Sequence, residues 1–343
     1  MSWTKERYAI APQLKDYDNL PSVWKPYTMF CQYPNYVSES VNTDDIGQRF
    51  TTLNNGERLN ISTIKGKCDL LIGASTAFGV GATHDRFSIS SVLSDSSGRQ
   101  VISLSGRAYN SRQELLLFIE NMHLFDKIEN IIIMSGANNL YVSSFRDKFA
   151  PPFFWSQSFY EAISKIGLNK NFLLLAAFFE FLGFKEIDWS NTSKLKLINN
   201  ISDICFGRDD RKTKSSINIS AAADRTIQDL NTFKKLSKSL GFNLFFCLQP
   251  VAGWLRKPPV KEEQILFEKT SEQVKEVLIQ LCSQSTHAEY KSSIAKFCKE
   301  SEICFHDLNT NIEFAEEWLF VDRVHLTDLG YSRVAKYIQD NVL

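Results

Sequence analysis

The residues best suited to chemistry are a serine, a glycine and an asparagine, each placed soon after an apolar segment. They are Ser75, Gly106 and Asn138. Near the C-terminus, His325 follows Asp322 by three residues. Acyl transfer through serine needs a base for the hydroxyl proton, an acid that orients the base, and hydrogen-bond donors for the oxyanion. The backbone amides of Ser75 and Gly106, with the Asn138 side chain, could supply three such donors.

The elements around these residues alternate between strand and helix. Residues 70–72 are apolar without polar alternation, which is typical of a parallel strand covered on both faces, and two further strands are expected at 100–104 and 128–134. A helix with an apolar face is expected after Ser111, which forms a capping-box pattern with Glu114. This alternation predicts the α/β class, as a three-layer α/β/α arrangement around a central parallel, flavodoxin-like sheet. It continues with a helix over 221–240, a strand over 244–248, helical residues 261–300, a strand over 303–305 and a last helix capped by Thr327.

Two parts of the chain do not fit the alternation. Residues 1–65 carry Pro, Tyr and Trp without clear periodicity, and we expect an N-terminal arm that packs on the core and covers it. Residues 66–343 then form the main domain. Within it, residues 141–216 are too long for a simple crossover, so we expect an insertion that forms a helical and aromatic cap.

Composition narrows the class of protein. Thirty-nine basic residues balance 39 acidic ones, which does not favour electrostatic binding of nucleic acid or membranes. The N-terminus lacks the apolar core of a signal peptide, and the most apolar window, 172–184, is too short to cross a bilayer. A cytoplasmic protein without a membrane span is expected. Seven cysteines without a C-x-x-C pair suggest neither a metal knuckle nor a disulfide framework, and no metal or cofactor is expected.

Four separate blocks resemble those of the SGNH, or GDSL-type, hydrolase superfamily. They are Gly73-Ala74-Ser75, Gly106, Gly136-Ala137-Asn138-Asn139 and Asp322-Arg323-Val324-His325. The resemblance implies the SGNH-hydrolase fold, with Ser75 as nucleophile, His325 as general base and Asp322 as the residue that orients it. It also implies that Gly106 and Asn138 complete the oxyanion hole with the Ser75 amide.

The chain departs from the family pattern at three positions. Ala74 and Asn139 stand where the family has aspartates, and Ala108 lies where some relatives have the glycine of the second block. The stretch from Asn42 to Arg49 is loosely similar to one in the SGNH proteins of bacterial surface-polysaccharide and glycan gene clusters.

The expected function is that of a serine esterase acting through an acyl-enzyme. The resemblance points to a short acyl ester, an O-acetyl group on a carbohydrate, as the substrate. The alternatives are an acyltransferase to a sugar hydroxyl with the same triad, and a non-catalytic glycan- or partner-binding protein. Arg107, Trp254 and Arg256 are candidate substrate-binding residues, while His306 and Asp307 are a second His–Asp pair should the first fail. The sequence leaves the oligomeric state open.

Overall fold

The centre of the structure is one five-stranded sheet in which every neighbouring pair of strands is parallel. The computed structural model describes residues 3–144, 216–268, 272–312 and 316–343. The strand order is β6-β5-β7-β8-β9, and the predicted α/β class with a central parallel sheet is confirmed. The strands are β5 (Lys67–Gly73), β6 (Val101–Ser105), β7 (Lys127–Ser135), β8 (Asn243–Leu248) and β9 (Cys304–Asp307).

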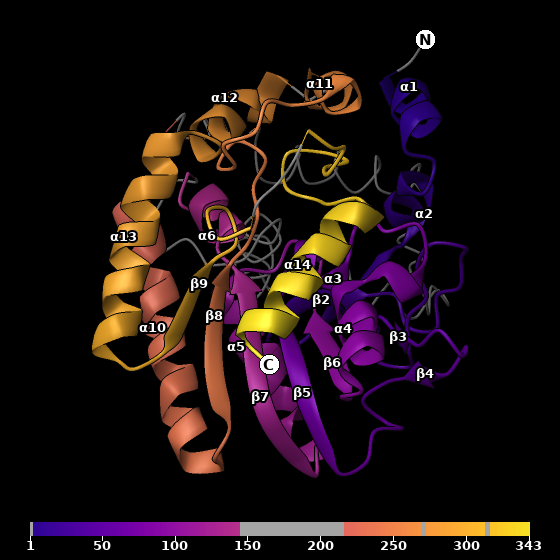
Figure 1. Cartoon of the computed structure of the whole chain (residues 1–343), viewed down its shortest axis with the longest axis vertical. Coiled ribbons are helices and arrows are strands. Elements are labelled where there is room, and N and C mark those ends of the chain that lie inside the picture. The colour runs from indigo at the N-terminus through magenta and orange to yellow at the C-terminus, as the bar shows by residue number, and fades with distance from the viewer. Residues whose placement is uncertain (1–2, 145–215, 269–271, 313–315) are drawn as a thin grey trace, which may run out of the picture. The chain divides into compact units, whose positions relative to one another are not determined.

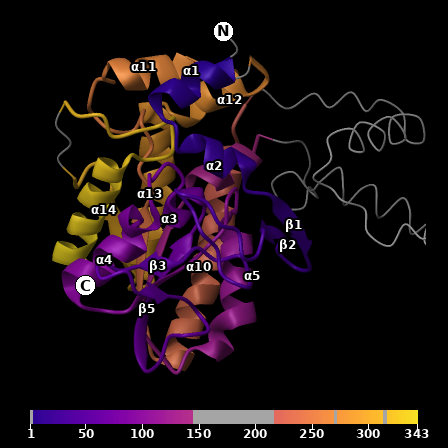
Figure 2. The same ribbon diagram turned by 90° about the vertical axis from the view of Figure 1, so that its right-hand side faces the viewer.

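Helices cover both faces of the sheet, which explains the apolar runs of its strands. On one face, Leu71 and Ile132 pack with α4 (Ile89–Ser97) and α14 (Asp328–Asn341). On the other, Leu70 and Ile131 pack with side chains of three helices, α5 (Ser111–Asn121), α10 (Ile219–Leu240) and α13 (Gln284–Glu300). Figure 1 shows α14 and α4 in front of the sheet, and Figure 2 separates the two helical layers on either side of β5. Because successive side chains of a strand point to opposite faces, both faces of each central strand are apolar.

The order of the strands reverses direction between β5 and β7. The chain runs from β5 outward to β6, then returns past β5 to β7 and continues to β9. Ligands of open parallel sheets bind at such a switch point, outside the carboxyl ends of the strands. Two short helices begin there, α3 (Ser75–Phe78) after β5 and α6 (Ala137–Val142) after β7. Ser75 and Asn138 therefore lie at the switch point.

The N-terminal residues form two helices and two small hairpins against the main sheet and its helices. The elements are α1 (Trp3–Ile10), α2 (Leu14–Asn19), β1 (Ser22–Lys25) with β2 (Met29–Gln32), and β3 (Thr51–Thr52) with β4 (Arg58–Leu59). Leu14 and Tyr17 of α2 are buried in one cluster with Phe78 and Val321. The Tyr17 hydroxyl also donates to the carbonyl of Ala82 over 2.8 Å. The N-terminal segment therefore covers residues that follow α3 and the end of α3 itself.

Helix boundaries confirm some local predictions and correct others. Thr327 caps α14 as predicted, since its side chain accepts from the Gly330 amide. The cap of α5 is Asn110 with Gln113, one residue earlier than the predicted pair. The helical stretch 261–300 is divided among α11 (Lys261–Glu268), α12 (Glu272–Leu281) and α13. In the described part of the chain, 3₁₀ turns form at η1 (Asp85–Phe87) and η2 (Met122–Leu124).

The predicted cap insertion, residues 141–216, lies almost wholly outside the described residues, which include only 141–144 and 216 of it. None of the helices in the described part of the chain has the length and apolar character needed to cross a membrane.

We predict that Leu71→Ala lowers the free energy of unfolding by about 2–5 kcal/mol, because it leaves a cavity between the sheet and α14. Leu71 is fully buried. The measurement is urea denaturation followed by circular dichroism. Leu240→Ala is the control, since that side chain is 51% exposed at the end of α10, and it should change stability by less than about 0.5 kcal/mol. Equal losses in the two variants would contradict the assignment of Leu71 to the core.

Candidate active site

Ser75, His325 and Asp322 form a hydrogen-bonded chain at the carboxyl edge of the sheet. The Ser75 Oγ lies 2.7 Å from His325 Nε2, and His325 Nδ1 lies 2.6 Å from Asp322 Oδ2. All three residues are partly exposed among the described parts of the chain. In this arrangement the imidazole can take the serine proton at Nε2 while the carboxylate holds the proton at Nδ1.

A sharp turn after β5 presents Ser75. A side chain at Gly73 would place its Cβ 2.2 Å from the Met134 carbonyl oxygen, so only glycine allows β5 and β7 to approach this closely here. Ser75 is the first residue of α3. The next residue, Thr76, donates its hydroxyl to the carbonyl of Val324 over 3.1 Å. This bond directly joins the turn that carries Ser75 to the loop that carries His325.

Asp322 is held as a carboxylate by its surroundings. Its Oδ1 accepts from the backbone amides of Val324 and His325, each over 2.9 Å. Burial would raise the pKa of Asp322, but the neighbouring His325 and these two amides outweigh it and lower the pKa to about 2. The side chain is therefore charged at neutral pH and can stabilise an imidazolium.

The structure does not support Gly106 as an oxyanion donor. Its amide already donates to the carbonyl of Gly73 over 3.2 Å, in continuation of the pairing between β5 and β6. Glycine is required at this position for another reason, because a Cβ there would lie 2.4 Å from the ring of Tyr109. The second-block glycine of the sequence is thus a packing position.

Ala108 has the features expected of the missing donor. Its φ of 61° lies in the left-handed region, which a glycine favours and an alanine adopts only with strain. The residue is partly exposed, and its amide donates to no group within the described residues. The sequence pointed to this position only through the glycine that some relatives carry there.

Asn138 lies beside the same loop. Its Nδ2 donates to the carbonyl of Tyr109 over 2.6 Å, which orients the side chain and leaves the second amide hydrogen for another acceptor. The neighbouring Asn139, which replaces a family aspartate, is buried and structural. Its side chain accepts from the Ser111 amide and donates to the Ser111 hydroxyl, over 3.1 and 2.8 Å.

Two predicted substrate-binding side chains are engaged in holding the fold. Arg107 donates to the carbonyls of Tyr17 and Leu20 over 2.6 and 2.5 Å and thus fastens α2; burial lowers its pKa to about 10. Trp254 is fully buried, and its indole donates to the carbonyl of Leu281 over 2.6 Å. Trp254 is enclosed by the fold and reaches no surface, which corrects that expectation, whereas Arg107 is only partly buried, so its predicted contact with substrate stays a prediction.

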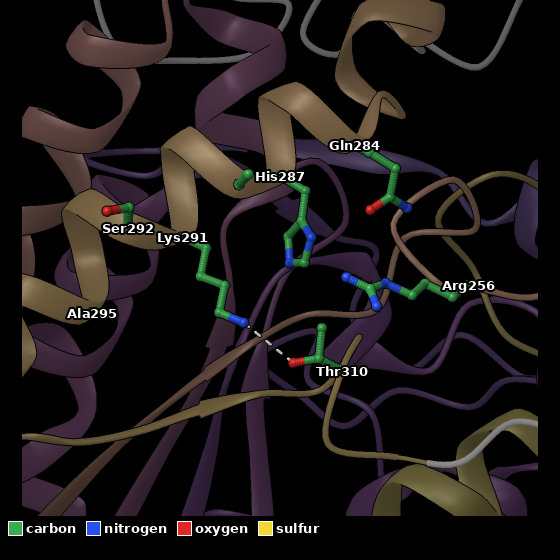
Figure 3. Close-up of a pocket in the computed structure, with 8 residues that line it drawn as sticks. Arg256, Gln284, His287, Lys291, Ser292, Ala295 and Thr310 are labelled. Atoms are coloured by element: carbon green, nitrogen blue, oxygen red, sulfur yellow. Dashed lines mark hydrogen bonds between the residues drawn. The ribbon is translucent and has the colours of Figure 1, made fainter.

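The third predicted substrate-binding residue, Arg256, is exposed and lines a cavity of about 460 Å³. The cavity lies between α13 and the turn after β9, with His287, Lys291 and Thr310 on its walls, as Figure 3 shows. None of its lining residues belongs to the triad: they are Arg256, Gln284, His287, Ala288, Lys291, Ser292, Ala295 and Thr310. The placement of Arg256 therefore does not connect it to Ser75.

The fallback His306–Asp307 pair does not form. Asp307 contacts His287 Nε2 at 3.1 Å and Lys291 Nζ at 2.8 Å, while His306 Nδ1 lies 3.0 Å from the Tyr337 hydroxyl. These contacts join β9 to α13 and α14. Within the described ranges, no three His, Cys, Asp or Glu side chains gather as the ligands of a metal would.

Sequence reasoning missed the residues that support this site from behind. Gln249, just after β8, donates to the Thr76 hydroxyl over 3.1 Å. Glu114 of α5 is fully buried and accepts from the hydroxyl of Ser135, the last residue of β7, over 2.7 Å. Burial raises the pKa of Glu114 to about 8, although the Ser135 bond opposes this. Gln249 carried a positional signal, since it follows an apolar strand as Ser75 does.

Comparison with known proteins places the chain near esterases and lipases of known structure. No family model and no curated relative matches the sequence. An acetyl xylan esterase, AlAXEase, aligns with 12% identity over 81% of this chain and 100% of its own, with a TM-score of 0.40. A carbohydrate acetylesterase family member from Sinorhizobium meliloti aligns with 12% identity over 81% of this chain and 97% of its own, with a TM-score of 0.43. A GDSL-like lipase from Bacteroides thetaiotaomicron aligns with 12% identity over 80% and 86%, with a TM-score of 0.39.

We predict that Glu114 makes the protein less stable as the pH rises from 5 to 8. Its folded pKa lies above the unfolded value of about 4.3, so the folded state binds the extra proton and loses that advantage as the pH rises. The slope approaches a limit of about 1.4 kcal/mol per pH unit. Urea denaturation of wild type and Glu114→Gln at several pH values measures the difference. The neutral glutamine variant should show a shallower decline, and parallel curves would contradict a protonated Glu114.

Proposed function

We propose that the protein is an ester hydrolase of the SGNH type that forms an acyl-enzyme on Ser75. The observation that carries the proposal is the chain of two hydrogen bonds, 2.7 and 2.6 Å long, that joins Ser75 through His325 to Asp322. Side chains that act as nucleophile, base and orienting acid need this contact geometry. Two of the four family blocks in the sequence, Gly73-Ala74-Ser75 and Asp322-Arg323-Val324-His325, independently name the same three residues.

In the proposed first step, Ser75 Oγ attacks the ester carbonyl carbon while its proton passes to His325 Nε2. The proton on His325 Nδ1 stays on the ring and is donated to Asp322, whose negative charge stabilises the imidazolium. The negative charge that develops on the carbonyl oxygen is met by the amides of Ser75 and Ala108 and by the free hydrogen of Asn138 Nδ2. His325 then protonates the leaving alcohol, and the Ser75 acyl ester remains.

In the second step, His325 takes a proton from water, and the oxygen of that water attacks the acyl carbon. The tetrahedral intermediate uses the same donors. It collapses when the bond to Ser75 Oγ breaks and His325 returns the proton to the serine. The carboxylic acid leaves, and the enzyme is restored. The family resemblance favours a short acyl group, an O-acetyl group on a carbohydrate, as the substrate.

Reaction with a fluorophosphonate probe tests the nucleophile. We expect the wild type to be labelled at Ser75 and to hydrolyse 4-nitrophenyl acetate, whereas Ser75→Ala should lose both, because no alkoxide equivalent remains. Ser62→Ala is the matched control, since Ser62 is an exposed serine of the N-terminal segment, and it should behave as wild type. Equal labelling of the wild type and Ser75→Ala would remove the mechanism, and an unlabelled wild type would favour the non-catalytic alternative.

The oxyanion assignment makes a separate prediction for Asn138. We expect Asn138→Ala to lower kcat for 4-nitrophenyl acetate by about 10²–10³-fold with little change in KM, because the lost donor acts on the transition state. Steady-state kinetics measures this. The buried Asn139→Ala variant serves for comparison. It should lower the free energy of unfolding, while its kcat should fall much less than that of Asn138→Ala. An unchanged kcat in folded Asn138→Ala would exclude Asn138 from the oxyanion hole.

A further inference from the structure

Arg49 of the N-terminal segment is buried directly behind the nucleophile turn. Its side chain is 1% exposed, and every nitrogen has a partner. Nε donates to Asp85 Oδ1 over 2.8 Å, and Nη2 donates to the carbonyl of Ser40 over 2.6 Å. Nη1 donates to two carbonyls, those of Phe78 and Gly79, over 3.1 and 2.7 Å. Such a fan of donors in one plane is available only to arginine.

The partner carboxylate of Arg49 is equally enclosed. Asp85 is fully buried and also accepts from the backbone amide and the side-chain amide of Asn42, over 3.1 and 2.6 Å. Taking two charges out of water is expensive, and a buried ion pair often stabilises a fold no more than apolar residues of similar volume would. The pair is therefore better explained by the geometry that it imposes than by stability alone.

The two carbonyls that accept from Arg49 Nη1, those of Phe78 and Gly79, belong to the turn that carries Ser75. The amides of Gly79 and Val80 both donate to the Ser75 carbonyl over 3.0 Å, so Arg49 is linked to Ser75 through a single peptide unit. Gly79 has a φ of +86°, and a Cβ there would lie 2.7 Å from Arg49 Nη1. Because α3 has only four residues, it is too short to keep its own conformation without such tertiary contacts.

The residue before Arg49 acts on the neighbouring loop. Gln48 Oε1 accepts from the amide of Ser105 over 2.9 Å, at the point where β6 leads into the loop with Ala108. The turn that presents these two side chains is itself braced, since Asp44 Oδ1 accepts from the Gln48 amide over 2.7 Å. One tight turn of the N-terminal segment thus contacts both the nucleophile turn and the loop of the proposed oxyanion donor.

We infer that Arg49 is a positioning residue for Ser75, acting through the Gly79 peptide, and that the N-terminal segment is part of the catalytic apparatus rather than a cover. The inference rests on the proposed function for its effect on rate, but its effect on the turn is independent of activity. A displacement of about 1 Å at a reacting atom can reduce the rate by about 100-fold, so a small loosening of α3 should be visible in kcat.

A second arginine–aspartate pair serves as the control. It lies at the start of β5, the strand whose other end leads to Ser75. Arg99 pairs with the buried Asp69 near the start of β5, with Nη2 2.9 Å from Asp69 Oδ1. It is also an arginine–aspartate pair joining two segments, but it lies at the amino end of the sheet. Arg99 is 32% exposed and also pairs with Glu129, so the two variants need not lose equal stability. Well below its Tm, a variant that has only lost stability should keep kcat, whereas a loss of positioning should lower kcat for Arg49 alone.

The experiment compares Arg49→Lys with Arg99→Lys, each folded and well below its Tm. Lysine keeps the charge but cannot reach all the acceptors of Arg49. We expect Arg49→Lys to lower kcat for 4-nitrophenyl acetate by about 10- to 100-fold with KM nearly unchanged, and Arg99→Lys to keep the wild-type kcat. Hydrogen exchange read by mass spectrometry should speed up in peptides spanning 74–82 for Arg49→Lys only.

The outcomes distinguish failure of the proposed esterase function from failure of the positioning role of Arg49. If the wild type is inactive and unlabelled but exchange still rises at 74–82 in Arg49→Lys, the proposed function fails and the positioning of the turn stands. If the wild type is active and Arg49→Lys keeps kcat and exchange while its Tm falls as in Arg99→Lys, the inference is overturned. Should Arg49→Lys not fold, Asp85→Asn removes the same ion pair with an isosteric side chain and must show the same fall in kcat.

Discussion

The parallel pairing of β5 with both β6 and β7 is the constraint from which the candidate site follows. In register, Gly73 lies opposite Ser105 on one side and Met134 on the other. All three strands therefore end at the same edge, and the residues that follow them must meet there. Ser75, Ala108 and Asn138 come from these three ends, although more than 60 positions separate the first from the last. A slip in register would separate them.

The fourth contribution comes from the far end of the chain. The bond between Ser75 and His325 joins residues 250 positions apart, and the loop that carries His325 leads directly into α14. That helix packs on the sheet beside α4, and the Thr76 hydroxyl donates to the loop carbonyl of Val324. The imidazole is thus placed by a helix on one face of the sheet and by a bond to the turn that carries Ser75.

Buried polar groups lie behind the candidate site. Arg49 with Asp85 stands behind α3, and Glu114 with Ser135 stands behind the start of α6. Each group costs desolvation free energy, and each restricts the backbone next to a proposed catalytic residue. Their hydrogen bonds join the end of α3 and the last residue of β7 to neighbouring elements.

The sequence by itself determined the features that local pattern controls. Apolar runs identified the strands of the parallel sheet, Thr327 identified the start of α14, and four short blocks selected Ser75, Asn138, Asp322 and His325. Tertiary structure decided which donors are free. The Gly106 amide is used by the Gly73 carbonyl, Arg107 and Trp254 are used by backbone carbonyls of other segments, and Arg49 is buried behind Ser75. A residue type shows that a group can donate, but only the carbonyl that packing places opposite it determines where the hydrogen bond goes.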